Sequence, residues 1–184
     1  MKSRAILLLL VLHFSISALH SQSDRSRLAA IEYAQLLLRI QQGDMSVDFQ
    51  AFRTDGAFVA GQHFSMREVA DRTTFKTSMA ASNPQGALDF SNRTLELDYA
   101  NAVAHFDAMM ACRALNKPEE AATHEKILNA LLDSITKAGD GKSPETSYLA
   151  VTTQEEYIFM SLRLGVKPKK QSLVVQKGPL LRRS

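Results

Sequence analysis

Residues 100–116 read ANAVAHFDAMMACRALN, and they are the centre of the stretch from Ala87 to Thr146 that decides the fold. Apolar side chains recur there at steps of three and four, which places them on one side of a helix. They are Ala102, Phe106, Met109, Met110 and Leu115. Pro118 suits the first turn of the next helix, and Gly139 is a natural end for it. The stretch predicts two antiparallel helices followed by a longer one.

A repeat signal accompanies these helices. The segment from Glu119 to Ala122 echoes the segment from Gln85 to Leu88, and Ala87 lies 34 residues before Ala121. That spacing is the period of tetratricopeptide units. The unit over residues 84–138 is therefore similar to a tetratricopeptide helical hairpin. Because about three repeats are needed for a free-standing solenoid, we expect other elements to close the core.

The rest of the chain predicts further helices and two short strands. We expect a helix over residues 23–42, a short helix or turn from Asp48, an irregular connection around Gly56 and Gly61, and a helix over residues 66–79 capped by Ser65. A last helix opens at Thr153. Residues 148–151 and 171–175 have strand-like composition. The predicted fold is mainly α, with tetratricopeptide-like hairpins and a small C-terminal β element (α+β).

The first 21 residues are typical of a secretory signal. Lys2 and Arg4 precede an apolar run of ten residues, and small residues follow it up to Ser21. Ten residues are too few to span a bilayer. We expect cleavage after Ser21, with Ala18 as a competing site. This predicts an exported protein, periplasmic or extracellular, with no stable membrane insertion after cleavage. The expected parts are a signal peptide (1–21), a helical domain (22–165) and a short strand with a basic tail (166–184).

The number of cysteines and the distribution of charge argue against a disulfide-stabilised fold and a nucleic-acid-binding protein. Cys112 is the single cysteine, so no intramolecular disulfide can form, and its apolar helix face favours a buried inert thiol over a nucleophile. Residues 157–184 contain seven basic residues and no acidic one. Such a tail can contact anionic surfaces or simply be a solvated end. Since no basic motif is interleaved with aromatic residues, we expect no nucleic-acid partner.

Five stretches together resemble a secreted family known as a domain of unknown function, DUF4919. They are Asp48-Phe49 with Arg53, Ala104-His105-Phe106, the Gly-Asp-Gly-x-Ser-x-Glu-Thr run over 139–146, Glu155-Glu156-Tyr157 before Leu164-Gly165, and Gln171-Ser172-Leu173. The resemblance implies export, helical-hairpin packing and a C-terminal sheet, and it implies no activity. Proteins of this family usually continue into further strands after the last stretch, and from the resemblance we expect those strands to be missing here.

The loop over residues 139–146 is the sharpest candidate site. Its Gly-Lys-Ser is not a phosphate loop, because Thr136 stands where the upstream glycine is needed. It also lacks the carboxylates of a calcium loop. A structural turn is favoured, with Ser143 or Glu145 binding backbone amides, and a binding or catalytic loop is the alternative.

Two histidines on neighbouring helices are the other candidates. If the helices are antiparallel about Lys117, His105 and His124 lie roughly 7 Å or more apart along the axis. That spacing is awkward for a shared metal without a third ligand. We therefore expect satisfied helix-face histidines, and no metal or cofactor.

Three functional hypotheses follow. The first is a non-enzymatic module that binds a protein or peptide in a groove along residues 87–122, with the loop at its rim. Its candidate binding residues are His105, His124, Asp140, Lys142 and Glu145. The second is an exported enzyme that uses His105, His124, Asp140 or Glu145 as acid–base groups. The third is a structural envelope protein whose basic tail contacts anionic surfaces.

Overall fold

The computed structural model describes residues 24–63 and 72–166, and over these ranges the protein is mainly helical. A helix over residues 24–41 comes first. The others are α2 (Phe49–His63), α4 (Thr73–Ala80), α5 (Pro84–Leu97), α6 (Ala102–Ala114), α7 (Pro118–Ile135) and α8 (Thr153–Arg163). Two short 3-10 turns, η1 (Thr136–Ala138) and η2 (Pro144–Thr146), lie between α7 and α8. The expected signal peptide and almost all of the basic tail lie outside the described residues.

Local sequence signals set the ends of the central helices. The side chains of Asn83 and Asn101 cap α5 and α6 by accepting hydrogen bonds from backbone N–H groups three residues on. Pro84 and Pro118 occupy the first positions of α5 and α7. Asn116 takes a left-handed conformation (φ 56°) between α6 and α7. Because the connections are this short, consecutive helices must reverse direction and pack on each other.

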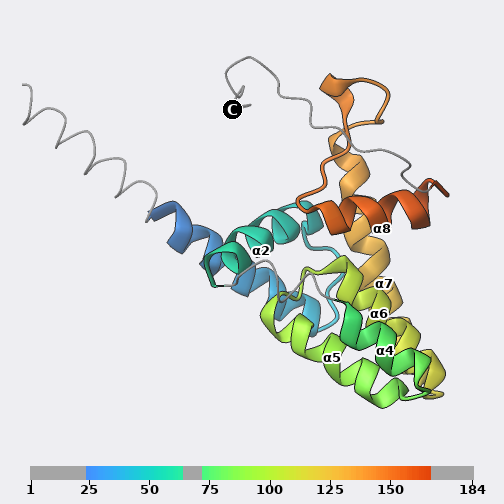
Figure 1. Cartoon of the computed structure of the whole chain (residues 1–184). Helices are drawn as coiled ribbons and strands as arrows, with labels where there is room; N and C mark the ends of the chain where they lie inside the picture. Colours follow the sequence, from blue (N-terminus) through green and yellow to red (C-terminus); the bar gives the residue numbers. More distant parts are fainter. Residues whose placement is uncertain (1–23, 64–71, 167–184) are drawn as a thin grey trace, which may run out of the picture.

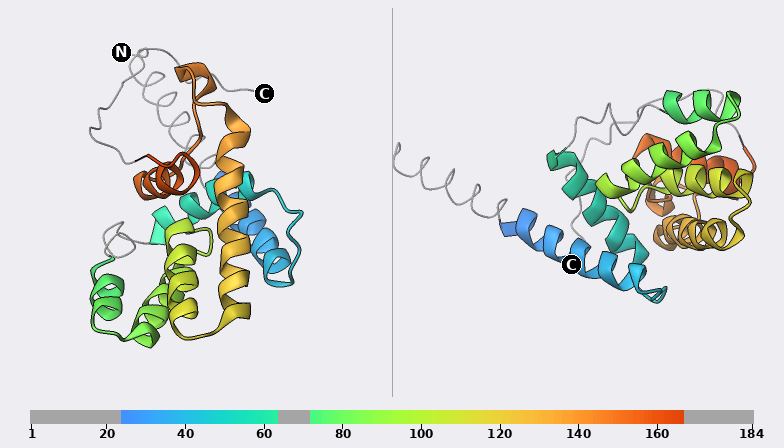
Figure 2. Two further views of the ribbon diagram at one scale, coloured as in Figure 1. Left: turned by 90° about the vertical axis from the view of Figure 1, so that its right-hand side faces the viewer. Right: turned by 90° about the horizontal axis from the view of Figure 1, so that it is seen from below.

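The long helix α7 joins two apolar clusters into one body (Figure 1; Figure 2, left). Its first half, with Ala121, belongs to a cluster built with α5 and α6, in which Ala87, Ala108 and the buried Cys112 lie. Its second half, with Leu131, Leu132 and Ile135, belongs to a cluster that includes α2, α8 and the helix over 24–41. Helix α6 packs most extensively on α7 and then on α5. The extra helices therefore close the core that the hairpins leave open.

The predicted strand over residues 148–151 is wrong. No strand is found within residues 24–63 and 72–166, and residues 147–150 have no regular secondary structure. The backbone groups of this segment are used elsewhere: the Leu149 N–H donates to the Ile135 carbonyl at the end of α7 (3.4 Å). A backbone N–H that already donates to the end of a helix cannot also donate to a neighbouring β-strand. The second predicted strand, residues 171–175, lies outside the described residues.

The predicted irregular connection around Gly56 and Gly61 is also wrong, because α2 runs through both positions. The reason is packing at Gly56. A Cβ atom there would lie 2.9 Å from the Ala100 Cβ and 2.9 Å from a ring carbon of Tyr33. Glycine here permits a close approach of three segments and does not mark a turn. The helix predicted over 66–79 falls partly outside the described residues, which show α4 beginning at Thr73.

We predict that Gly56→Ala destabilises the protein. In an exposed helix this change would stabilise by about 0.5–1 kcal/mol through helix propensity. Here the added methyl group overpacks against Ala100 and Tyr33, so a net loss of about 1–3 kcal/mol is expected. Urea denaturation of both proteins measures the difference. A more stable Gly56→Ala protein would show that the close approach is not constraining.

Candidate functional site

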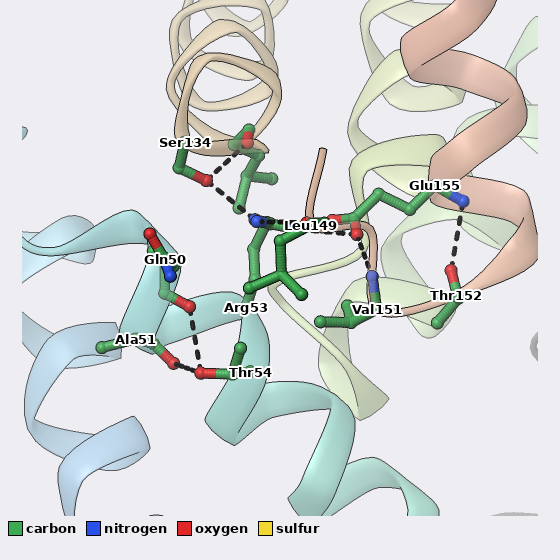
Figure 3. Close-up of polar contacts among 10 residues, drawn as sticks. Gln50, Ala51, Arg53, Thr54, Ser134, Leu149, Val151, Thr152 and Glu155 are labelled. Atoms are coloured by element: carbon green, nitrogen blue, oxygen red, sulfur yellow. Dashed lines mark hydrogen bonds and ion pairs between the residues drawn. The ribbon is translucent and has the colours of Figure 1, made fainter. Parts of the chain in front are cut away.

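A fully buried arginine links four segments (Figure 3). Arg53, on α2, donates from Nε to the Ser134 hydroxyl on α7 (2.7 Å) and from Nη1 to the Glu155 carboxylate on α8 (2.6 Å). Its Nη2 donates to the Leu149 carbonyl in the segment between these helices (3.0 Å). The Arg53 and Glu155 side chains are 0% and 6% exposed. All three nitrogens of the guanidinium group therefore have acceptors inside the protein.

The carboxylate partner is fixed from its own side as well. Glu155 lies in the first turn of α8, whose cap is Thr152 rather than the expected Thr153, and the Thr152 hydroxyl accepts from the Glu155 N–H (3.1 Å). The same Glu155 oxygen that binds Arg53 accepts from the Val151 N–H (2.7 Å). Burial raises the pKa of nearby Asp98 to about 6, and the charge of Glu155 contributes to the rise. The cluster is thus densely bonded around one ion pair.

We predict that Arg53→Met costs about 3–5 kcal/mol of stability, because it leaves the Glu155 carboxylate buried without its cation. Glu155→Gln should cost less than Arg53→Met, since a carboxamide oxygen still accepts from Val151. The double variant should lose clearly less than the sum of the two single losses. Urea denaturation of the four proteins tests this cycle. Additive losses would mean that the two side chains do not act as a pair.

The two candidate histidines touch each other, so the predicted separation is wrong. The Nδ1 atoms of His105 on α6 and His124 on α7 lie 3.0 Å apart. The predicted separation includes only the rise along the two helix axes. The imidazole side chains reach across this axial offset, so their rings come into contact. His105 Nε2 lies 2.9 Å from the Tyr99 carbonyl. His105 is fully buried, and its ring stands edge-on to Tyr99.

The hydrogen-bond partners assign the tautomers of the pair. A carbonyl only accepts, so His105 carries its proton on Nε2 and its Nδ1 is an acceptor. His124 Nδ1–H must then donate to His105. Burial, reinforced by the His124 charge, lowers the pKa of His105 to about 3. Burial also lowers the pKa of His124, against the opposing charge of Glu120. Both rings are therefore neutral at neutral pH.

The pair lacks the further ligands of a metal centre. Across residues 24–63 and 72–166, no group of three or more His, Cys, Asp or Glu side chains is placed to hold an ion. Cys112, also on α6, is buried with its sulfur 4.0 Å from Glu120, and burial raises the pKa of its thiol. The geometry fits a pair of histidines that join α6 to α7.

We predict that the histidine pair makes stability fall with acidification. The unfolded chain binds protons on its histidines below about pH 6.5, whereas the buried His105 resists protonation down to about pH 3. Stability is thus fully present above pH 6.5 and declines as the pH falls towards 3. Urea midpoints across this range should fall less steeply for His124→Gln/His105→Gln than for the natural chain.

A spectroscopic readout separates this effect from general acid sensitivity. Nitrogen NMR of the natural chain at neutral pH should show the His105 proton on Nε2. A proton on His105 Nδ1, or equal pH slopes for natural and variant chains, would contradict the assignment.

The loop over residues 139–146 forms a turn closed by its own side chains. Asp140 Oδ1 accepts from the Lys142 N–H (3.1 Å) and from the Thr146 hydroxyl (2.8 Å). Ser143 caps η2 by accepting from the Thr146 N–H. These bonds explain why the pKa values of Asp140 and Glu145 are lowered: the leading causes are the Thr146 and Ser143 side chains. Lys142 forms an exposed ion pair with Asp140 (3.0 Å).

The glycines of this motif are required by space and backbone angle. A Cβ at Gly139 would lie 2.1 Å from the Thr146 carbonyl oxygen. Gly141 has φ +70°, and a Cβ there would lie 2.4 Å from the Tyr148 ring. The contacts agree with the structural turn that the sequence favoured. The turn sends the chain back so that Leu149 and Val151 can reach Arg53 and Glu155.

The sequence-predicted site residues fall into two separate places. His105 and His124 face each other near the first third of α7. Asp140, Lys142 and Glu145 lie in the exposed turn beyond its other end. From His124 to Ile135 alone, α7 rises about 16 Å. The structure therefore brings the two histidines together and does not bring either to the loop.

Two sets of interior polar contacts were not predicted from the sequence: the Arg53 cluster and the pair of Arg72 with Asp107. Arg72 Nε donates to the Asp107 carboxylate (2.7 Å), and its second nitrogen binds the other oxygen. Arg72 also lies over the Phe75 ring, 5.5 Å from its centroid. Burial raises the pKa of Asp107, and Arg72 opposes the rise. The available signal was a carboxylate on the mainly apolar α6, which needs a cation.

The outer face of the helix over residues 24–41 exposes large apolar side chains. Leu28, Ile31 and Leu38 are 65%, 54% and 56% exposed. The opposite face of the same helix is packed: Leu36 and Ile40 are buried, and Tyr33 stacks on Phe52 of α2 with ring centroids 4.9 Å apart. The helix is thus held in place by one face and presents a second apolar face to solvent. No helix in the described part is long and apolar enough to cross a membrane.

Comparison with known proteins gives one match. The model of the family described as "Domain of unknown function (DUF4919)" covers residues 27–182. The chain belongs to this family. No curated protein and no solved structure matches the chain. The family membership agrees with the resemblance found in the sequence, and it carries no assigned activity.

Proposed function

We propose that this DUF4919 protein is an exported, non-enzymatic interaction module that binds an amphipathic helix of another protein chain. The contact surface is the outer face of the helix over residues 24–41. The single observation that carries the proposal is the exposure of Leu28, Ile31 and Leu38 on a helix whose other face is already packed. Export rests on the signal pattern of residues 1–21.

The placement of the polar groups supports binding over catalysis. A general acid–base catalyst needs groups that reach one substrate. The two histidines bond to each other and to a carbonyl, and the Asp140 turn bonds to itself. Arg53 and Glu155 form a buried ion pair with each other, so neither side chain is free to contact a substrate. These groups hold the fold together, which leaves the apolar surface as the feature without an internal role.

The apolar surface differs from the groove that the sequence suggested. In the tetratricopeptide-like unit, the large exposed apolar side chains are Leu97 (42%) and Met110 (38%), one on each of two helices. The helix over 24–41 instead places three large apolar side chains on one face at helical spacing, and each is more exposed than Leu97 or Met110. Recognition of one apolar helix face by another commonly uses anchors at this spacing. We therefore place the binding surface on this helix, with the hairpins as its support.

Site-specific photo-crosslinking in producing cells tests the proposal. A photoreactive residue at Ile31 should yield a discrete higher-mass adduct, because this side chain faces the partner. The matched control is Leu97, which is also apolar and exposed but lies on α5. It should yield no discrete adduct. Absence of an adduct at Ile31, or equal adducts at both positions, would contradict this surface.

A further inference from the structure

We infer that the partner helix is the same helix of a second copy of this chain, paired in parallel in a symmetric dimer. This inference rests on the proposed function and names its occupant. Three exposed apolar positions and one polar position follow a heptad pattern: Leu28, Ile31, Gln35 and Leu38 are separated by steps of three, four and three. This short run, the seam, has the spacing by which two helices interlock side by side in a coiled coil. All four positions are exposed.

Charges beside the seam specify the orientation. Leu28 and Gln35 take the first heptad position, and Ile31 and Leu38 take the fourth. Arg27 and Glu32 then lie on opposite flanks of the seam. In a parallel pair, a residue at the position of Arg27 meets the residue five places later in the other helix, which is Glu32 of the second copy. Two opposite-charge pairs therefore form across a parallel seam. In an antiparallel seam, residues at the heptad position of Arg27 lie on the side of the seam away from Glu32 of the second copy, so these pairs do not form.

The second copy would also balance negative charge at this edge. Glu32 lies close to Asp55 of α2, whose pKa is raised by burial and then by the charge of Glu32. Within residues 24–63 and 72–166, Asp55 Oδ2 is a buried oxygen without a hydrogen-bond partner. Arg27 of the second copy would approach these two carboxylates. The side of the seam that carries Glu32 and Asp55 thus has an excess of negative charge, which Arg27 of the second copy can neutralise.

The seam is preformed, which lowers the cost of pairing. Leu36, Ile40 and Tyr33 already hold the helix against the body from the opposite side. Figure 2 (right) shows the helix at the edge of the molecule beside α2, with its first turns extending beyond that helix. Neither helix has to order itself on association, so the usual entropic penalty is reduced. Gln35, a polar residue at one seam position, favours one register over sliding alternatives.

Sedimentation velocity of the purified chain over a wide concentration range tests the dimer. A monomer–dimer equilibrium is expected. Ile31→Glu should weaken dimerisation by about tenfold or more, because symmetry places two carboxylates opposite each other in an apolar seam. The matched control is Leu97→Glu, which removes another exposed apolar side chain (42% against 54% for Ile31) from α5 and should leave the equilibrium unchanged. At concentrations where both proteins are monomeric, circular dichroism melting should be the same for Ile31→Glu and the natural chain, since this side chain does not pack on the core.

Charge reversal tests the parallel arrangement. Arg27→Glu should weaken dimerisation about fivefold, because both interhelical pairs become repulsive. The double variant Arg27→Glu/Glu32→Arg should restore it. A dimer insensitive to Ile31→Glu overturns the seam. A dimer weakened by Ile31→Glu but indifferent to Arg27→Glu overturns the parallel register.

The inference and the function on which it rests fail in different ways. A chain that stays monomeric at every concentration overturns the second copy as occupant. If the Ile31 photo-adduct then has the mass of a foreign protein bound to one chain, the interaction function stands without self-association. If removing residues 167–184 from that monomer creates association, this segment of the chain itself covers the seam, and the inference is overturned. No adduct together with no dimer removes both proposals.

Discussion

The ion pair between Arg53 and Glu155 is the contact on which the arrangement of the second half of the chain depends. A buried guanidinium requires acceptors in its own plane, and here they come from α7, α8 and the segment between these helices. These three must be held at fixed positions relative to α2. The glycine-rich turn after α7 and the close approach at Gly56 are two means by which the backbone reaches those positions. The 139–146 motif therefore serves this interior cluster through geometry rather than through direct contact.

The sequence predicted what depends on neighbours along the chain. The start of α7 followed from Pro118 at its first turn, and the end of the helical run after it followed from Gly139. The Asp140 turn followed from its glycines and hydroxyls. Each of these features is decided within a few residues, where the physical rules are strong.

Features decided by contacts between distant residues could not be predicted in the same way. Gly56 looked like a helix breaker, because its neighbours Ala100 and Tyr33 are invisible to local patterns. Axial rise alone misplaced His105 relative to His124, since it contains neither the crossing of the two helices nor the reach of the imidazoles. Residues 148–151 had strand-like composition, yet Arg53 and the end of α7 take their backbone groups. The site residues named from sequence lie in two separate places, the histidine pair between α6 and α7 and the turn over residues 139–146.

The separation in sequence between Arg53 and its partners has a consequence for synthesis. A ribosome makes Arg53 about 100 residues before Glu155. At roughly 5–20 residues per second, about 5–20 s pass between the synthesis of Arg53 and that of its carboxylate partner. During that interval α2 has apolar residues and an unpaired cation but no completed docking surface. The contacts of Arg53 with α7, α8 and Leu149 can therefore be completed only when nearly all of the protein has been made.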